Sequence, residues 1–194
     1  MFNPIASYRI QFNKEFTFKQ LDDQLEFFFL LGPGAIYASP VFEAVPGSMH
    51  GYNVTNANAL NPEIGKYTEF TALSDKLKEK GMGWIQDIVP NHMAFDSKNN
   101  WLFDVLEKGV YSKYAGYFDI DYEHPGLQKK LMAPFLGKTV TEAVNEGEIK
   151  LQTFKGSFVF RYFDNLFPVN FTTFQIICQK YLQNTPFFFY QILE

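Results

Sequence analysis

The sequence has little cysteine and no excess of positive charge, and each of these absences excludes a class of function. Its only cysteine is Cys178, so no internal disulfide can form. The neighbours of this residue are aromatic and apolar, which predicts a buried thiol rather than a nucleophile. The formal net charge is -4 and the sequence has no basic cluster, which argues against nucleic-acid binding.

Long apolar runs are also missing. The two longest, 27–31 and 186–190, fall far short of the roughly 20 residues that a membrane-spanning helix needs. Residues 1–9 have neither the basic start nor the apolar core of a signal peptide. We therefore expect a cytoplasmic protein that does not contact a membrane.

What the sequence does contain is typical of a soluble globular protein. Hydrophobic residues make up 46% of the 194 residues and charged residues 20%. A chain of this length buries roughly 70% of its unfolded surface, which supports one core of ordinary size. Aromatic residues reach 19%, and most must lie in the core, although rings on loops also suit the apolar faces of sugars.

Strand and helix patterns alternate over the first 90 residues. A capping box at Thr17–Gln20 begins a helix that ends at Gly32, with Leu25 and Phe29 on its apolar face. Because strands and helices alternate, we expect an α/β fold in which three parallel strands are joined by crossover helices. The predicted strands are 6–11, 35–38 and 83–89, the second helix is 67–80, and a long loop covers 41–66.

The alternation lapses after residue 92, which indicates an inserted, mostly helical excursion. Residues 149–154 and 157–163 form a predicted β-hairpin, which a parallel sheet could not include. Asn170 is suited to cap a helix over 171–183, and the pair at 185–186 starts another. Short helices are expected at 101–108, 111–117 and 139–146, the last of them after a capping box.

A first candidate site follows the third predicted strand, which reads as buried. Asp87, Asn91 and His92 gather where Pro90 ends that strand, and ligands bind at the carboxyl ends of parallel strands. A carboxylate there needs a cation, a hydrogen-bond network or a ligand, and a structural ion pair is the alternative. A satisfied core histidine is the alternative for His92.

A second candidate site lies in the loop 47–53, which contains two glycines. His50 and Tyr52 could present an imidazole and a stacking ring to one ligand such as a sugar, whereas simple packing is the alternative for Tyr52. Asn53 suits a turn. The three histidines, including His124, show no i, i+4 ligand spacing, so we expect no metal site.

Four segments of the sequence resemble the maltooligosyl trehalose synthases, a branch of the α-amylase superfamily. They are 6–12 (ASYRIQF), 37–40 (YASP), 46–52 (PGSMHGY) and 87–93 (DIVPNHM). Three further segments agree in the same order: 61–65 (NPEIG), 117–121 (YFDID) and 133–137 (APFLG). The last of the four recurs across the superfamily, whereas the ordered set is specific to the trehalose-forming branch.

The resemblance implies a (β/α)8 barrel with an inserted domain after the third strand. Residues 1–92 would then supply barrel strands one to three, 93–168 the inserted excursion, and 169–194 helices that return toward the barrel. The implied reaction is an intramolecular transglucosylation without a cofactor. It converts the reducing-end α-1,4 linkage of a maltooligosaccharide into an α,α-1,1 linkage, with one carboxylate as nucleophile and another as acid/base.

The resemblance also assigns roles to individual residues. It implies that His50, Tyr52, Asn91 and His92 line the subsite for the transferred glucose, with Asn53 beside them. Asp87 and Arg9 would support this subsite, Asp87 through a further arginine beyond this chain. The chain departs from the family at Asn53 and Asn56, which are usually aspartates, and at Val45, where a basic residue is frequent. An amide loses the ionic hydrogen bond, which is about twice as strong as a neutral one.

The family's catalytic carboxylates lie on the fourth, fifth and seventh strands, which this sequence does not reach. About 250 residues close such a barrel, so we expect these 194 residues to be inactive alone. The open sheet would be covered by the rest of the barrel or by a partner. The alternative is a non-catalytic remnant that binds glucan or a partner. A hydrolase of the same superfamily is a third interpretation, but the acidic residues of the excursion do not lie on core strands.

Overall fold

The computed structural model describes residues 4–127, 131–132, 135–154 and 156–184, with side chains up to residue 180. The chain divides into two compact units, Met1–Asn99 and Asn100–Glu194, each of which is described by itself. The domain limits expected from the sequence at 92 and 168 stay predictions.

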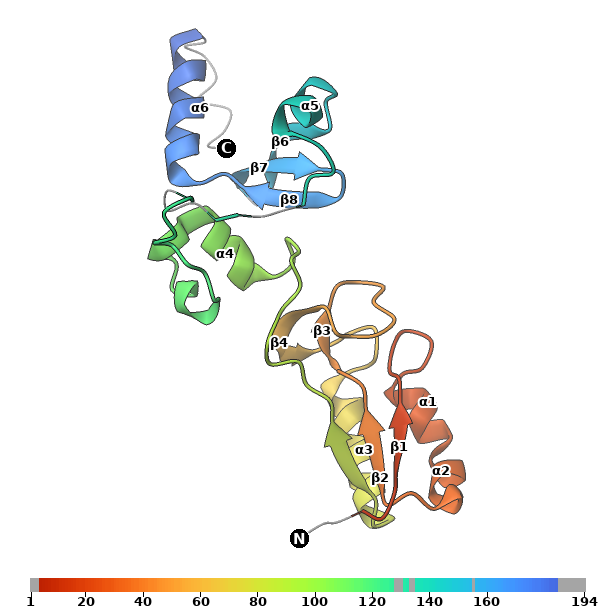
Figure 1. The fold of residues 1–194 in the computed structure, drawn as a ribbon. Coiled ribbons are helices and arrows are strands. Elements are labelled where there is room, and N and C mark those ends of the chain that lie inside the picture. The colour runs from red at the N-terminus through yellow and green to blue at the C-terminus, as the bar shows by residue number, and fades with distance from the viewer. Residues whose placement is uncertain (1–3, 128–130, 133–134, 155, 185–194) are drawn as a thin grey trace. The chain divides into compact units, whose positions relative to one another are not determined.

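The first unit is built on a parallel sheet with the order β1-β2-β5 (Figure 1). In register, Ile10 lies beside Ala38, and Ala38 beside Gln86. Helices connect the strands, so the expected α/β arrangement is confirmed. The strands are β1 (Ser7–Ile10), β2 (Ala35–Ala38) and β5 (Gly83–Gln86), and the helices are α1 (Phe18–Asp23), α2 (Leu25–Leu31) and α3 (Tyr67–Glu79).

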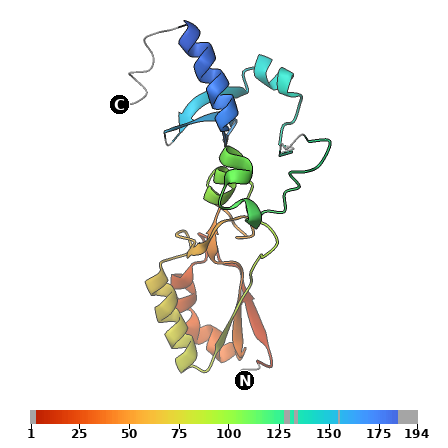
Figure 2. The ribbon, with the colours of Figure 1, turned by 90° about the vertical axis from the view of Figure 1, so that its left-hand side faces the viewer.

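The helices cover one face of this sheet, as Figure 2 shows. Successive residues of a strand point to opposite faces. Apolar strand residues such as Ile10 and Ile36 are therefore buried against the helices, where Leu21 and Leu73 meet them in one core cluster. The alternate residues of β1 and β2, including Arg9, lie on the other face. The core thus lies between the helices and one face of the sheet.

The first predicted helix is divided into two, which the sequence pattern did not indicate. The Gln24 amide donates to the carbonyls of both Gln20 and Leu21, at 3.2 and 3.1 Å, and this tightens the last turn of α1. A second helix starts at Leu25, and within it Phe29 is 41% exposed rather than buried. Gly32, at φ 90°, ends α2 as predicted.

Two further predictions about the first unit were wrong. The expected loop 41–66 contains an antiparallel pair, β3 (Phe42–Ala44) and β4 (Val54–Leu60), whose asparagines looked like turn residues. The third predicted strand is not buried, since Ile85 is 39% exposed and Ile88 59%. The strand found there, β5, lies at the edge of the sheet in the described part of the chain. It ends at Gln86 rather than at the predicted residue 89.

The second unit contains the predicted hairpin and a third strand, β8, which the sequence did not indicate. Asn170 Oδ1 accepts from the Thr173 amide at 2.9 Å, so the expected cap is confirmed. Cys178 is only partly buried, and the helix expected at 185–186 lies outside the described residues. The elements are α4 (Asn100–Lys108), η1 (Gly109–Tyr111), η2 (Ala115–Tyr117), α5 (Val140–Asn145), β6 (Ile149–Phe154), β7 (Ser157–Tyr162), β8 (Asn165–Pro168) and α6 (Phe171–Asn184).

Within the described ranges, no helix is both long enough and apolar enough to cross a membrane.

Ser39 joins β2 to the segment after β1, and its removal should destabilise the first unit. This fully buried side chain accepts from the Phe12 amide at 2.8 Å. In Ser39→Ala the Phe12 N–H has no acceptor, and we expect the free energy of unfolding to fall by about 1–3 kcal/mol. Ser74→Ala, on the exposed side of α3, should change it by less than about 0.5 kcal/mol. Urea denaturation measures both, and equal midpoints for the two variants would contradict this role of Ser39.

Candidate functional site

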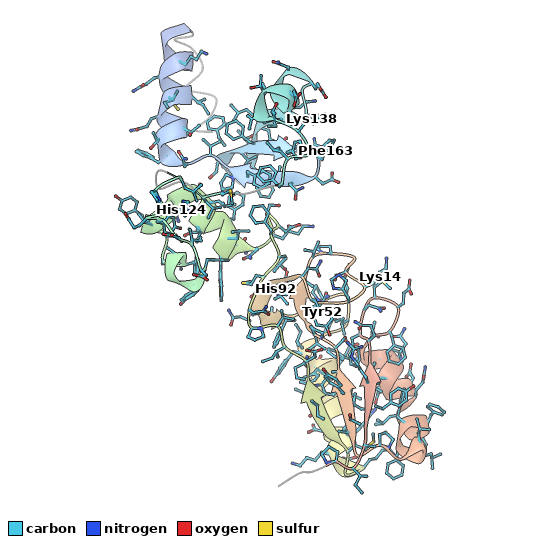
Figure 3. All side chains as sticks on the ribbon, in the orientation of Figure 1. Lys14, Tyr52, His92, His124, Lys138 and Phe163 are labelled. Carbon is cyan, nitrogen blue, oxygen red and sulfur yellow. The ribbon has the colours of Figure 1, made fainter. Side chains whose placement is uncertain are left out.

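The candidate residues lie at the carboxyl ends of the three parallel strands. The β3–β4 pair lies beyond these ends in Figure 1, and the segment between its strands contributes His50 and Tyr52. Asp87 directly follows β5, and Arg9 lies in β1. Figure 3 shows Tyr52 close to His92 at this end of the unit. The topology therefore brings both predicted constellations to one end of the sheet.

A hydrogen-bonded network is centred on the Asp87 carboxylate. The Tyr52 phenol donates to Asp87 Oδ2 at 2.6 Å, and the Tyr37 phenol approaches the same oxygen at 3.4 Å. Arg9 Nη2 donates to the Tyr52 hydroxyl at 3.1 Å and lies 4.0 Å from Asp87 Oδ2. The Arg9 guanidinium also lies 5.7 Å from the centre of the Tyr37 ring. Asp87 is thus paired within this chain.

The network is mainly hydrogen-bonded rather than ionic. At 4.0 Å, with 42% of the Arg9 side chain exposed, the Arg9–Asp87 attraction is weakened by water. Tyr52 lies between the two charges. The hydrogen bond that the Tyr52 phenol donates to the Asp87 carboxylate raises the pKa of Tyr52 above its ordinary value of 10.0, because this bond favours the protonated phenol. The neutral phenol is therefore the form that holds this network together.

The backbone between β3 and β4 fixes the His50 and Tyr52 rings relative to each other. The Tyr52 amide donates to His50 Nδ1 at 3.0 Å, and the two rings stack with their centres 6.0 Å apart and 23° between their planes. Because His50 Nδ1 accepts, a neutral imidazole carries its proton on Nε2. The His92 Nε2 atom lies 3.1 Å from the Tyr52 carbonyl oxygen. These contacts join His50, Tyr52 and His92 in one group.

The three asparagines near the site differ in their hydrogen-bond partners and exposure. Asn53 Oδ1 accepts from the Ser48 hydroxyl at 2.5 Å, so its amide oxygen is engaged within the loop. Asn56 Nδ2 donates to Glu43 at 3.1 Å across the β3–β4 pair, where an aspartate would face another carboxylate. Asn91 is exposed beside His92. The structure thus brings every predicted site residue to the same end of the sheet, with Asn53 turned toward its own loop.

Sequence reasoning missed three residues of the site. Tyr37 was assigned to a buried strand, although its hydroxyl faces Asp87. Gln11 Nε2 donates to the His50 carbonyl at 3.1 Å, and the Glu63 carboxylate accepts from the Gly47 amide at 2.9 Å. Strand alternation could have placed Tyr37 beside Arg9 once the register was known, whereas the Glu63 contact had no signal in the sequence.

No group of three or more histidine, cysteine, aspartate or glutamate residues in the described part of the chain lies close enough to hold a metal ion.

Comparisons with known proteins identify the relatives of this chain. The family model described as "Alpha amylase, catalytic domain" matches residues 17–162. A curated Mycobacterium tuberculosis protein that carries the name maltooligosyl trehalose synthase is 38% identical over 143 residues, which are 70% of this chain and 18% of that protein. The resemblance inferred from the sequence motifs is thereby confirmed.

Solved structures lead to the same group. A crystal structure of a maltooligosyl trehalose synthase is 40% identical at a TM-score of 0.79 and covers 84% of this chain and 22% of its own. The maltooligosyltrehalose synthase from Arthrobacter ramosus is 34% identical at a TM-score of 0.73, with 86% and 21% covered. The chain spans about a fifth of the length of these relatives.

Gly51 must stay without a side chain for the loop to keep its position. Its φ is 76°, and a Cβ atom there would lie 2.6 Å from the Pro40 carbonyl oxygen. We expect Gly51→Ala to lower the free energy of unfolding by about 1–3 kcal/mol. Gly47→Ala is the matched control, since Gly47 has φ 79° but open space around it, and should cost about 1 kcal/mol. Urea denaturation measures both; a Gly51 variant as stable as the Gly47 variant would show that Pro40 does not confine this loop.

The Asp87 carboxylate should control the ionisation of Tyr52. We expect the pKa of Tyr52 to lie above 10.0 in the native chain and to fall in Asp87→Asn, because the hydrogen bond from the phenol to a carboxylate is lost. A pKa raised by folding contributes stability that is present below the unfolded value and is lost as pH rises through the folded value. NMR titration of the labelled tyrosine ring measures this pKa, with Asp75→Asn on α3 as control. An unchanged Tyr52 pKa in Asp87→Asn would refute the coupling.

The fold, the site and the comparisons lead to the same assignment. Three parallel strands carry polar residues at their carboxyl ends, and the family model covers most of this architecture. The similar crystal structures extend the match to both units of the chain. The chain belongs to the family of alpha-amylase catalytic domains.

Proposed function

We propose that this chain supplies the glucose-holding part of the active site in an enzyme similar to the maltooligosyl trehalose synthases. The substrate is a maltooligosaccharide whose reducing-end α-1,4 linkage is rearranged to an α,α-1,1 linkage. The observation that carries the proposal is the stacked His50–Tyr52 pair, which Asp87 and Arg9 hold at the carboxyl ends of the strands.

The chemistry of this pair suits a terminal glucose. A flat aromatic ring accepts the apolar face of a pyranose, and imidazoles donate to or accept from its hydroxyls. The contacts of His50 use its Nδ1 and those of His92 its Nε2. Each ring therefore has its second nitrogen available to a sugar hydroxyl. Arg9, 42% exposed, adds a cationic donor beside Tyr52.

Asp87 acts in this proposal as a brace and not as a nucleophile. Its Oδ2 atom is occupied by the Tyr52 phenol at 2.6 Å. A retaining transfer needs two carboxyl groups about 5–5.5 Å apart. In the described first unit, the carboxylates of Glu43 and Glu63 form hydrogen bonds with Asn56 and with the Gly47 amide. We therefore propose that these 194 residues bind glucan and that carboxylates elsewhere in the enzyme perform the transfer.

The proposal also concerns the apolar surface beside the site. We propose that the remainder of the barrel or a partner covers the exposed side chains of Ile85, in β5, and Ile88, just after it. A cytoplasmic location fits a chain whose one cysteine forms no disulfide. A non-catalytic glucan-binding role is the second candidate, and the engagement of Asn53 and Asn56 within their own hairpin favours it.

Titration with maltopentaose tests glucan binding by the 194-residue chain. His50→Ala and Tyr52→Ala should each weaken binding about 10-fold, because a hydroxyl partner or a stacking face is lost. His124→Ala, in the second unit, is the matched control and should bind like the parent chain. Isothermal titration calorimetry gives the three affinities.

Two outcomes would contradict the proposal. Affinities unaffected by the His50 and Tyr52 substitutions would place any glucan site elsewhere. Formation of a trehalose-ended product from maltopentaose by these residues alone would show that the proposed division between binding and transfer is wrong.

A further inference from the structure

The segment that contributes His50 and Tyr52 is held from outside by several side chains. Gln11 Nε2 donates to the His50 carbonyl at 3.1 Å, and Asn13 Nδ2 to the Met49 carbonyl at 3.4 Å. The two Glu63 carboxylate oxygens lie 3.1 and 2.9 Å from the Gly47 amide nitrogen, which donates to them. The loop is therefore fixed at its start and near its centre.

Gln11 differs from the other two side chains because it uses both ends of its amide. Its Oε1 accepts from Arg9 Nη1 at 3.1 Å, while its Nε2 donates to the His50 carbonyl. The same Arg9 donates through Nη2 to the Tyr52 hydroxyl at 3.1 Å. Gln11 thus completes a connected path from the Asp87 carboxylate through Tyr52 and Arg9 to the backbone at His50.

We propose that Gln11 is a positioning residue that orients the His50 and Tyr52 rings for the sugar, an inference that rests on the proposed function. The position requires one group that accepts from a guanidinium and donates to a carbonyl. Only the amide side chains, glutamine and asparagine, offer an acceptor oxygen and a donor nitrogen on one planar group, and glutamine has the longer reach. A glutamate could keep the Arg9 bond, but it would place a carboxylate against the His50 carbonyl.

The loop needs such an anchor because its own backbone is permissive. Gly47 and Gly51 have φ angles of 79° and 76°, and glycine loses more conformational freedom on ordering than any other residue. A loop that is ordered before the sugar arrives leaves a smaller entropy cost for binding. Without Gln11, that cost falls on the binding step, and affinity decreases although the sugar-contacting rings are unchanged.

The experiment compares Gln11→Glu, Gln11→Met and Gln24→Glu in the 194-residue chain. Gln24 is exposed between α1 and α2 and serves as the matched control. We expect both Gln11 variants to bind maltopentaose about 3- to 10-fold more weakly, because each loses the hydrogen bond to the His50 carbonyl. Backbone 15N relaxation should show increased motion at residues 49–52 in both, while Gln24→Glu matches the parent chain in affinity and in loop motion.

The two readouts separate this inference from the proposed function. If the Gln11 variants keep the parent's loop order, or bind as tightly as the parent, Gln11 does not position the rings. If the parent chain itself binds no maltopentaose, the proposed function fails, and the relaxation data alone decide whether Gln11 orders the loop. Recovery of affinity in Gln11→Glu, which keeps the Arg9 bond, would also overturn the requirement for an amide.

Discussion

The site depends on one hydrogen bond, from the Tyr52 phenol to the Asp87 carboxylate at 2.6 Å. It joins the segment after β3 to the residue that follows β5, which lies 35 positions later in the sequence. Arg9 from β1 reaches the same phenol, so the ends of separate parts of the unit meet at a single oxygen. Without the phenol, Arg9 and Asp87 would lose the group that forms a hydrogen bond to each of them.

The sheet makes this junction possible because its two faces have different surroundings. Helices cover the face that carries Ile10 and Ile36, where apolar side chains form the core. Arg9 and Tyr37 are register partners on the other face, and the Tyr37 hydroxyl lies 3.4 Å from the carboxylate of Asp87, which directly follows β5. The packing of the core on one face of the sheet therefore fixes the strands, and the strands fix the positions of these polar side chains.

The parts of the structure that could be predicted are those governed by local patterns. The boundaries of β2, the end of α2 at Gly32 and the cap at Asn170 follow from composition over a few residues. The motif resemblance and the parallel order of the strands also indicated one end of the sheet for His50 and His92, which both contact the Tyr52 backbone.

Other features depend on contacts that are distant in sequence. The asparagines of β4 favour turns locally, yet pairing with β3 makes them strand residues. Ile85 is exposed because it shares the face of Tyr37, which points away from the helices, and an apolar run does not reveal this. Gln11 and Glu63 contact the loop across 39 and 16 positions, and nothing near either residue in the sequence indicates its partner.

A crystal structure of the chain with bound maltopentaose tests the central claim most directly. The account predicts a terminal glucose stacked on Tyr52, with a hydroxyl within about 3.2 Å of His50 Nε2; a sugar bound only in the second unit would contradict it.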